Sequence, residues 1–180
     1  MSNSANLEAK AFSMECIETA LLALMKKKPY GEISYSELAK RAGVSRNAIY
    51  RNYQTQDDIL EKFFQKKTEA FLKTVSASET YADYLLKLFE LLYALRDESR
   101  LLLNAGKENI VYRAFLYMRN RYHGVDDAIR DYYDFYRIGG IYSVYIHWLE
   151  CGCKETPQEL CSVVLEVMKI YGIVPGQSSL

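Results

Sequence analysis

The clearest capacity for chemistry lies in four successive residues, Ser45, Arg46, Asn47 and Ala48, at the start of a predicted helix. An Arg side chain can pair bidentately with guanine and an Asn side chain with adenine, while an Ala methyl group offers only a small apolar contact to thymine. Arg51, one turn further along, is better placed for phosphate contact or packing. This set of residue types predicts a segment that reads base edges in the major groove of DNA.

Two short helices are needed to position that segment. Ser34 and Glu37 have the spacing of a capping box, and they predict a helix that ends at Gly43, which can adopt a left-handed conformation. Ser45 can cap a second helix that runs through Tyr50. Because the connection is short, the pair predicts a helix-turn-helix unit, which places the first residues of its second helix in the major groove.

The rest of the sequence also has helical periodicity. Apolar residues three and four apart predict a helix from Ser13 to about Lys28, and Thr55 can cap a helix that runs toward Val75. After a polar stretch at Ser76, the pattern predicts helices over 81–95, 99–105, 108–122, 126–151 and 157–171, with frayed ends at 1–7 and 176–180. No segment is typical of a strand, so we predict an all-α fold.

The composition fits one compact domain or a small domain fused to a larger one, with 180 residues, 49% apolar and 26% charged. No stretch approaches the roughly 18 uninterrupted apolar residues of a membrane span, so we expect a cytoplasmic protein with reduced cysteines and no membrane partner. The net charge of zero conceals a basic segment, since residues 26–53 hold seven Lys and Arg against two Glu. Charge alone fits DNA binding and a solvated face equally well.

The stretch SYSELAKRAGVSRNAIYRNYQTQDDIL, residues 34–60, resembles the TetR family of bacterial transcriptional regulators. The family pattern has an Ala in the second helix, a Gly-Val-Ser turn, an aliphatic-Tyr pair, a later aromatic residue and a Ser or Thr that opens the fourth helix. In this sequence the pattern is met by Ala39, Gly43-Val44-Ser45, Ile49-Tyr50, Tyr53 and Thr55. The resemblance covers the first 75 residues.

Two positions depart from the family pattern. Gln56 stands where the family usually has a Lys that contacts phosphate, so we expect a weaker salt dependence at that contact. Asn47 stands where Gly or Pro is usual, which makes it a candidate base reader. The resemblance and the base-reading chemistry together give these DNA-contacting residues: Ser34, Tyr35, Ser45, Arg46, Asn47, Ala48, Tyr50, Arg51, Tyr53 and Gln56.

The stretch GGIYSVYIHWLECGCKETPQEL, residues 139–160, is similar to the carboxyl-terminal part of many TetR-like proteins of Gram-positive bacteria. That similarity implies a homodimer in which the last two helices of each chain form a four-helix interface. The implied interface residues are Gly139, Gly140, Trp148, Leu160, Val164 and Met168. The resemblance further implies a DNA-binding domain over 8–54, a connecting helix over 55–75, a ligand-binding and dimerisation domain over 76–175, and palindromic double-stranded operator DNA as partner.

Tyrosine is abundant in the second part of the chain, where a TetR-like body would enclose the cavity of a small-molecule effector. A Tyr side chain suits such a wall because it combines an apolar ring with one polar group. For any one residue, a plain core or interface role is the competing interpretation. The candidate ligand-binding residues are Tyr84, Phe89, Tyr93, Asn104, Tyr112, Phe115, Tyr142 and His147.

Other function classes are weakly supported by the residues present. His147, Cys151 and Cys153 could bind metal or sense oxidants, but Cys-x-Cys is weak zinc spacing and only Lys154 is a nearby cation in sequence. No catalytic motif is present, so we expect no enzyme activity, no cofactor and no metal. The alternative to an effector-released repressor is a TetR-like co-regulator or activator that works through a protein partner.

Overall fold

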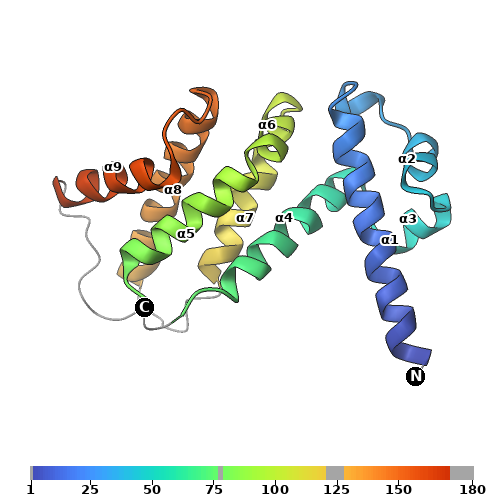
Figure 1. Ribbon diagram of the computed structural model, residues 1–180, viewed down its shortest axis with the longest axis horizontal. Helices are drawn as coiled ribbons and strands as arrows, with labels where there is room; N and C mark the ends of the chain where they lie inside the picture. The colour runs from blue at the N-terminus through green and yellow to red at the C-terminus, as the bar shows by residue number, and fades with distance from the viewer. Residues whose placement is uncertain (1, 77–78, 121–127, 171–180) are drawn as a thin grey trace. The chain divides into compact units, whose positions relative to one another are not determined.

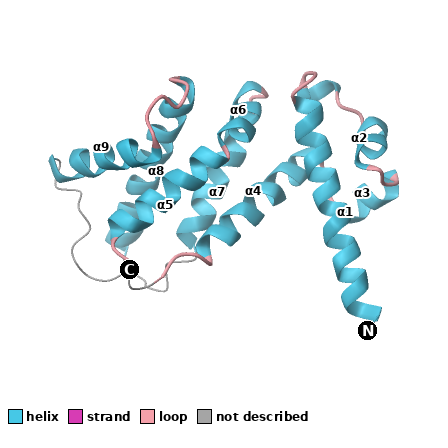
Figure 2. Cartoon of the chain, viewed as in Figure 1, coloured by secondary structure: helices cyan, strands magenta, loops and turns pink. Residues whose placement is uncertain are grey.

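The computed structural model describes residues 2–76, 79–120 and 128–170, and these residues form nine α-helices and one 3-10 turn, with no strand among them (Figures 1 and 2). The predicted all-α class is confirmed. In chain order the elements are α1 (Ser2–Met25), the 3-10 turn η1 (Tyr30–Glu32), α2 (Tyr35–Ala42), α3 (Arg46–Asn52), α4 (Gln56–Leu72), α5 (Tyr81–Ala94), α6 (Arg96–Asn104), α7 (Glu108–Asn120), α8 (Ala128–Glu150) and α9 (Pro157–Ile170).

The chain divides into two compact units. Unit 1 consists of Met1–Lys66 together with Leu101–Arg113, and unit 2 consists of Lys67–Arg100 together with Ala114–Leu180. Helices α4, α6 and α7 each contribute residues to both units. Segment 101–113 therefore belongs to the same compact unit as the helix-turn-helix, although about fifty residues separate them in sequence.

Unit 1 is built on α1, which packs against both α2 and α3. The predicted stripe on α1 is buried, with Ile17 and Leu21 fully inaccessible, and Leu38 of α2 and Ile49 of α3 are equally buried. Ala39 is small enough for α2 to lie close to its neighbours and is 5% exposed. Burial of these residues provides the main stabilisation of α1, α2 and α3, which we call the head. Each large aliphatic side chain contributes about 1.5–3 kcal/mol.

Helix α1 begins at Ser2, not near Ser13 as the sequence pattern predicted, so the segment expected to fray is helical from residue 2. The apolar stripe starts only at Ile17, which is why periodicity alone missed the first turns. Good helix formers such as Leu7, Ala9 and Lys10 occupy those turns, and neither Gly nor Pro interrupts them.

The helix ends in unit 1 follow the predicted caps. Ser34 Oγ accepts a hydrogen bond from the Glu37 amide at 3.2 Å, and Ser45 Oγ accepts one from the Ala48 amide at 3.1 Å. Gly43 closes α2 with φ of 69°, a left-handed conformation. The Glu37 carboxylate accepts from Lys28 Nζ at 2.6 Å, so this side chain also ties α2 to the end of α1.

Unit 2 is organised around two aromatic residues of α8. Tyr145 is fully buried, and its hydroxyl lies 2.8 Å from Ser99 Oγ and donates to the Leu92 carbonyl at 3.0 Å, which joins α8 to α5 and α6. Trp148 is 2% exposed and contacts the ring of Phe89 at a centroid distance of 6.2 Å. Helix α9 packs along α5 and begins with a capping box between Thr156 and Glu159.

Several helix boundaries differ from the sequence prediction or cannot be compared with it. Helix α6 begins at Arg96, three residues before the predicted Ser99. Acidic residues in its first turn, Asp97 and Glu98, favour that earlier start through the helix dipole. The predicted end of one helix at 121–122, the start of another at 126–127 and the last residues of the second domain, 171–175, lie outside the described residues.

The left-handed turn at Gly43 gives a test of the head's architecture. Gly43→Ala should lower the free energy of unfolding by about 1–2 kcal/mol, because a Cβ destabilises the left-handed conformation. Gly31→Ala is the matched control, since a Cβ there meets nothing within 4 Å and the backbone is not left-handed. Urea unfolding followed by circular dichroism measures both; equal changes in the two variants would contradict the assigned turn.

Candidate nucleic-acid interface and the surfaces of the second unit

The first turn of α3 presents the predicted base readers to solvent. Arg46 and Asn47 are exposed, and neither side chain has a hydrogen bond or ion pair with any other residue that the structure describes. Ala48 is half-buried, and the Ser45 hydroxyl is already used in capping the helix. The side chains of Arg46 and Asn47 are therefore available for bidentate hydrogen bonds with base edges.

Two tyrosines form a pair beside this turn. The rings of Tyr35 on α2 and Tyr50 on α3 lie 5.1 Å apart between centroids, and Tyr50 is 54% exposed. Burial, with a smaller contribution from Tyr50, raises the pKa of Tyr35 above its ordinary value, so its hydroxyl stays a neutral donor. Ser34 is exposed at the start of α2, and Arg51 is exposed near the end of α3.

Tyr53 is not a surface residue, and the prediction that it contacts DNA is wrong. It is 2% exposed, and its hydroxyl donates to Glu18 Oε1 at 3.2 Å. Glu18 is itself 3% exposed and pairs with Lys66 Nζ at 2.6 Å. Burial and the Glu18 carboxylate raise the pKa of Tyr53, so the phenol remains a donor that joins the end of α3 to α1.

Gln56 also has an internal role. Its Nε2 donates to the Ile33 carbonyl at 2.7 Å, so this amide group ties the first turn of α4 to the segment before α2. A Lys at this position would carry a free charge, whereas the Gln amide has one of its donors already occupied. The departure from the family pattern therefore removes a charge and adds a structural contact.

A polar network that the sequence did not indicate fixes the first turn of α4. Asp57 accepts hydrogen bonds from Tyr30 Oη at 2.5 Å and from Lys107 Nζ at 2.8 Å. Burial alone would raise the pKa of Asp57, but the hydrogen bonds from Lys107 and Tyr30 outweigh it and hold the pKa below its ordinary value. Arg113 also pairs with Glu61 of α4. These contacts explain why segment 101–113 belongs to unit 1.

Most of the predicted ligand-binding aromatics of unit 2 lie in two ring clusters. Phe115 contacts Tyr142 at 5.6 Å and Tyr145 at 6.0 Å between centroids. Tyr93 contacts Trp148 at 5.6 Å, and Phe89 contacts the same indole. Phe89 and Phe115 are buried at 0% and 2% exposure, so these two rings serve as core residues in this conformation.

The other ligand candidates are scattered. Tyr84 is buried and contacts the ring of Phe71 at 5.7 Å. Asn104 is exposed and Tyr112 is half-buried, and both belong to unit 1. His147 is exposed on α8 and is the candidate that lies on an open groove.

That groove runs between α8 and α9, has a volume of about 1030 Å³ and is lined mainly by apolar side chains. Val163 and Val167 lie on it and are 56% and 46% exposed. All six predicted interface residues line the groove: Gly139, Gly140, Trp148, Leu160, Val164 and Met168. Four of them, Trp148 and the three residues of α9, are buried and so form its floor. A Cβ added at either glycine would meet no atom of the described residues within 4 Å.

The thiols of unit 2 are unpaired, and their surroundings differ from the sequence-based expectation. Cys151 Sγ lies 3.5 Å from His147 Nε2 on the exposed face of α8. Arg100 donates to the buried Cys153 Sγ at 3.5 Å. The sequence suggested Lys154 as the only cation near these thiols, and the structure adds Arg100. Burial nevertheless raises the pKa of Cys153 and keeps it a thiol, despite the opposing charge of Arg100.

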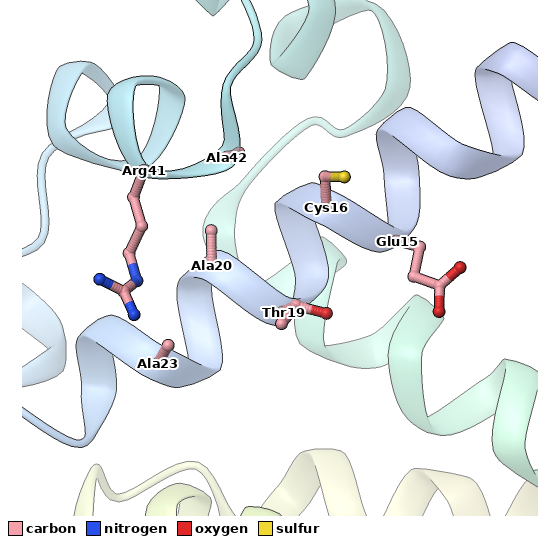
Figure 3. A pocket seen from close by; sticks show the side chains of 7 residues that line it. All are labelled: Glu15, Cys16, Thr19, Ala20, Ala23, Arg41 and Ala42. Carbon is pink, nitrogen blue, oxygen red and sulfur yellow. The ribbon is translucent and has the colours of Figure 1, made fainter.

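A smaller groove lies between α1 and α2 in unit 1. Figure 3 shows Arg41 extending from the end of α2 toward the part of α1 that carries Ala20 and Ala23, with Glu15 at the other end. Its walls are small or polar, and no aromatic side chain lines it. This groove follows from the small residues that allow α2 to lie close to α1.

Neither a metal cluster nor a membrane-spanning helix occurs in the described part of the chain. Its His, Cys, Asp and Glu side chains form no group of three or more that could hold a metal ion. Among the helices that the structure describes, none combines the length and apolar character needed to cross a membrane.

The reassignment of Tyr53 predicts a specific stability difference. Tyr53→Phe should lower the free energy of unfolding by about 1–3 kcal/mol, because the buried Glu18 loses a hydrogen-bond donor. Tyr50→Phe, which removes a hydroxyl from an exposed ring on the same helix, should change it by less than about 0.5 kcal/mol. Urea unfolding distinguishes them, and a neutral Tyr53→Phe would contradict the core role.

Comparison with known proteins is consistent with this geometry. Residues 17–63 match the family model described as bacterial regulatory proteins, tetR family, and residues 79–169 match the model described as transcriptional regulator C-terminal region. The first match contains α2, α3 and the turn between them. The second covers half of the chain and contains the helices of unit 2 that form the groove.

One curated relative and two solved structures illustrate the similarity. The uncharacterised HTH-type transcriptional regulator YxbF of Bacillus subtilis (strain 168) is 22% identical over 181 residues, covering 89% of this chain and 48% of the relative. The chain thus spans about half the length of that relative.

The dihydroxyacetone kinase operon activator DhaS has a TM-score of 0.62 at 16% identity, covering 88% of this chain and 95% of that structure.

The second solved structure is the transcriptional regulator FadR from Bacillus subtilis in complex with stearoyl-CoA. Its TM-score is 0.52 at 19% identity, covering 90% of this chain and 98% of that chain. Both structural likenesses concern the fold. With a helix-turn-helix that exposes Arg46 and Asn47, and with the two family models matched over the head and the body, the chain belongs to the TetR family of transcriptional regulators, not to an enzyme family.

Proposed function

We propose that this protein binds palindromic operator DNA as a homodimer in the cytoplasm and, as a repressor, is released from it by a small, partly apolar effector. Residues 8–54 act as the DNA-binding domain, the helix over 55–75 connects it to the rest, and residues 76–175 bind the effector and dimerise. The observation that carries the proposal is the exposure of Arg46 and Asn47 on a capped α3, with no partner in the described part of the chain.

The reading chemistry is divided along α3. Arg46 and Asn47 occupy the first turn, where they can pair bidentately with guanine and adenine. Arg51 and the Tyr35–Tyr50 pair lie beside that turn, where phosphate contacts fix the register of the helix without reading sequence. The basic segment 26–53 supports this division, because a net positive charge attracts the duplex before specific contacts form.

The α8–α9 groove supports the homodimer. A soluble protein rarely leaves a large apolar groove with exposed Val163 and Val167 uncovered. Gly139 and Gly140 lie in the middle of α8, where each weakens the helix by about 1 kcal/mol relative to Ala. Since neither glycine is needed for packing against the residues that the structure describes, close approach of a helix from a second copy accounts for both. A dimer also presents two recognition helices, as palindromic DNA requires.

The aromatic residues of unit 2 support an effector with apolar surface. Tyr93, Phe115 and Tyr142 contribute rings next to the core, and His147 adds a polar group on the groove. The FadR structure with stearoyl-CoA is a precedent for an effector of this kind in a protein of similar fold.

The effector would tilt α4, a single helix with residues in both units, and move the recognition helices off the roughly 34 Å separation of successive major grooves. It shifts the population only as far as it prefers the released state.

A second candidate function is activation of transcription through a protein partner. The name of DhaS, an operon activator, favours considering it. In that case the α8–α9 groove or the aromatic clusters would receive a partner chain, and no small molecule would release the DNA. Binding of an apolar fluorescent probe to the dimer, competed by candidate effectors, favours the repressor. Absence of any such binding favours the partner-dependent activator.

The division of roles along α3 predicts different outcomes for two arginines. On the duplex selected from a randomised library, Arg46→Ala should cost about 1–3 kcal/mol and relax the base preference, because it removes a bidentate base contact. Arg51→Ala should weaken binding about equally on all sequences, because it removes a phosphate contact. Fluorescence anisotropy on matched and mismatched duplexes measures both effects. If neither variant changes affinity, α3 is not the recognition helix.

The groove predicts a variant that separates the two chains. Val167→Lys should convert the dimer to a monomer at micromolar concentration, since it places a charge in an apolar interface. Ser162→Lys introduces the same side chain at an exposed position of α9 outside the groove lining and should leave the dimer intact. Sedimentation equilibrium measures the masses. A Val167→Lys variant that remains dimeric would place the interface elsewhere.

A further inference from the structure

The first half of α1 lies outside the part of the head that matches the family model. The matched region begins at residue 17, whereas α1 begins at Ser2. These extra turns carry the helix alongside α3, and α1 and α3 are in contact (Figure 1). The face of α1 that lies toward α3 in this region is therefore not part of the region matched by the family model.

That face is polar. Asn6, Ala9, Lys10 and Ser13 follow one another at the spacing that places residues on one side of a helix, in line with the buried Ile17. The stripe on α1 is thus apolar where it enters the core and polar where it passes the end of α3. A stripe that changes character in this way is not a continuation of the core.

Together with α3, this face forms a cleft of about 610 Å³. Its walls are Asn6, Ala9, Lys10 and Ser13 from α1, and Ala48, Arg51 and Asn52 from α3. The lining contains two cations and no acidic residue, and neither cation has an ion pair within the ranges that the structure describes. Glu8, which is near in sequence, is not part of the wall, since residues two apart on a helix do not share a face.

The neighbours of the two cations shape the space between them. Asn52 Nδ2 donates to the Ala48 carbonyl at 2.7 Å, which holds this side chain in the wall. Ala9 and Ala48 are small and leave the space between Lys10 and Arg51 open. Ala48 also belongs to the turn that carries Arg46 and Asn47, so the cleft adjoins the base-reading surface.

We propose that this cleft binds a backbone phosphate of the DNA duplex, with Lys10 and Arg51 as the charged contacts and Asn6 and Ser13 as neutral donors. The inference rests on the proposed function, because it adds a contact to the same DNA-binding surface. It assigns to α1 a role in fixing the register of α3 on the duplex, since phosphate contacts position a reading helix without carrying sequence information.

Lys10→Gln in the full chain tests the assignment. On the duplex selected by the wild-type protein, the slope of log affinity against log salt should fall by about 0.9 for each phosphate that the variant no longer neutralises, or about 1.8 for a dimer on two half-sites. The base preference should not change. Lys73→Gln removes the same charge at an exposed position of unit 2 and serves as the control. Equal slopes for Lys10→Gln and Lys73→Gln would overturn the proposal.

Single methylphosphonate substitutions in the duplex identify the phosphate. One neutralised position per half-site should weaken the wild-type protein more than it weakens Lys10→Gln, because the variant has already lost one of the two charged contacts to that phosphate and retains only Arg51. If no position behaves in this way, and inorganic phosphate at constant ionic strength instead protects Lys10 from acetylation, the cleft binds a free anion and the proposal is wrong. If the wild-type protein binds no duplex at all, the proposed function itself fails and the inference fails with it. Circular dichroism of the variants confirms that α1 is retained.

Discussion

A helix of seven residues does not hold its shape in water by itself, and α3 has that length. Every contact that stabilises α3 therefore determines whether Arg46 and Asn47 can be presented to DNA. Ser45 caps the helix, Ile49 anchors it in the core, and Tyr53 ties its end to Glu18 of α1. The rest of unit 1 follows from this constraint, because α1 and α2 provide the apolar surface on which so short a helix can be stable.

The helix that follows α3 is also held in place, by residues far away in sequence. Helix α4 follows α3 directly, and its first turn is held by Asp57, which accepts hydrogen bonds from Tyr30 and Lys107. Lys107 lies between α6 and α7, so its ion pair with Asp57 can transmit a change in those helices to α4, the helix that follows the head. Such a pair is only part-buried and contributes about 1 kcal/mol or less. A weak, reversible link of this kind suits a switch between two states of similar free energy.

Sequence patterns predicted the local features of the head correctly because those features depend on neighbouring residues. The caps at Ser34 and Ser45 and the left-handed Gly43 each follow from residues within one turn. The burial of Tyr53 and the Asp57 network could not be predicted, because their partners are 27 to 50 residues away and no periodicity records them. The first half of α1 was missed for another reason: its stripe is polar, whereas helical periodicity is visible in a sequence through its apolar residues.

The central claim is that two copies of this chain read DNA with two copies of α3. The most direct test is selection of duplexes from a randomised library by this chain, followed by measurement of the stoichiometry of the complex with the best sequence. We expect an inverted repeat with half-sites about one helical turn apart, bound by two chains. Enrichment of no sequence, or one chain bound to a single half-site, would contradict the claim.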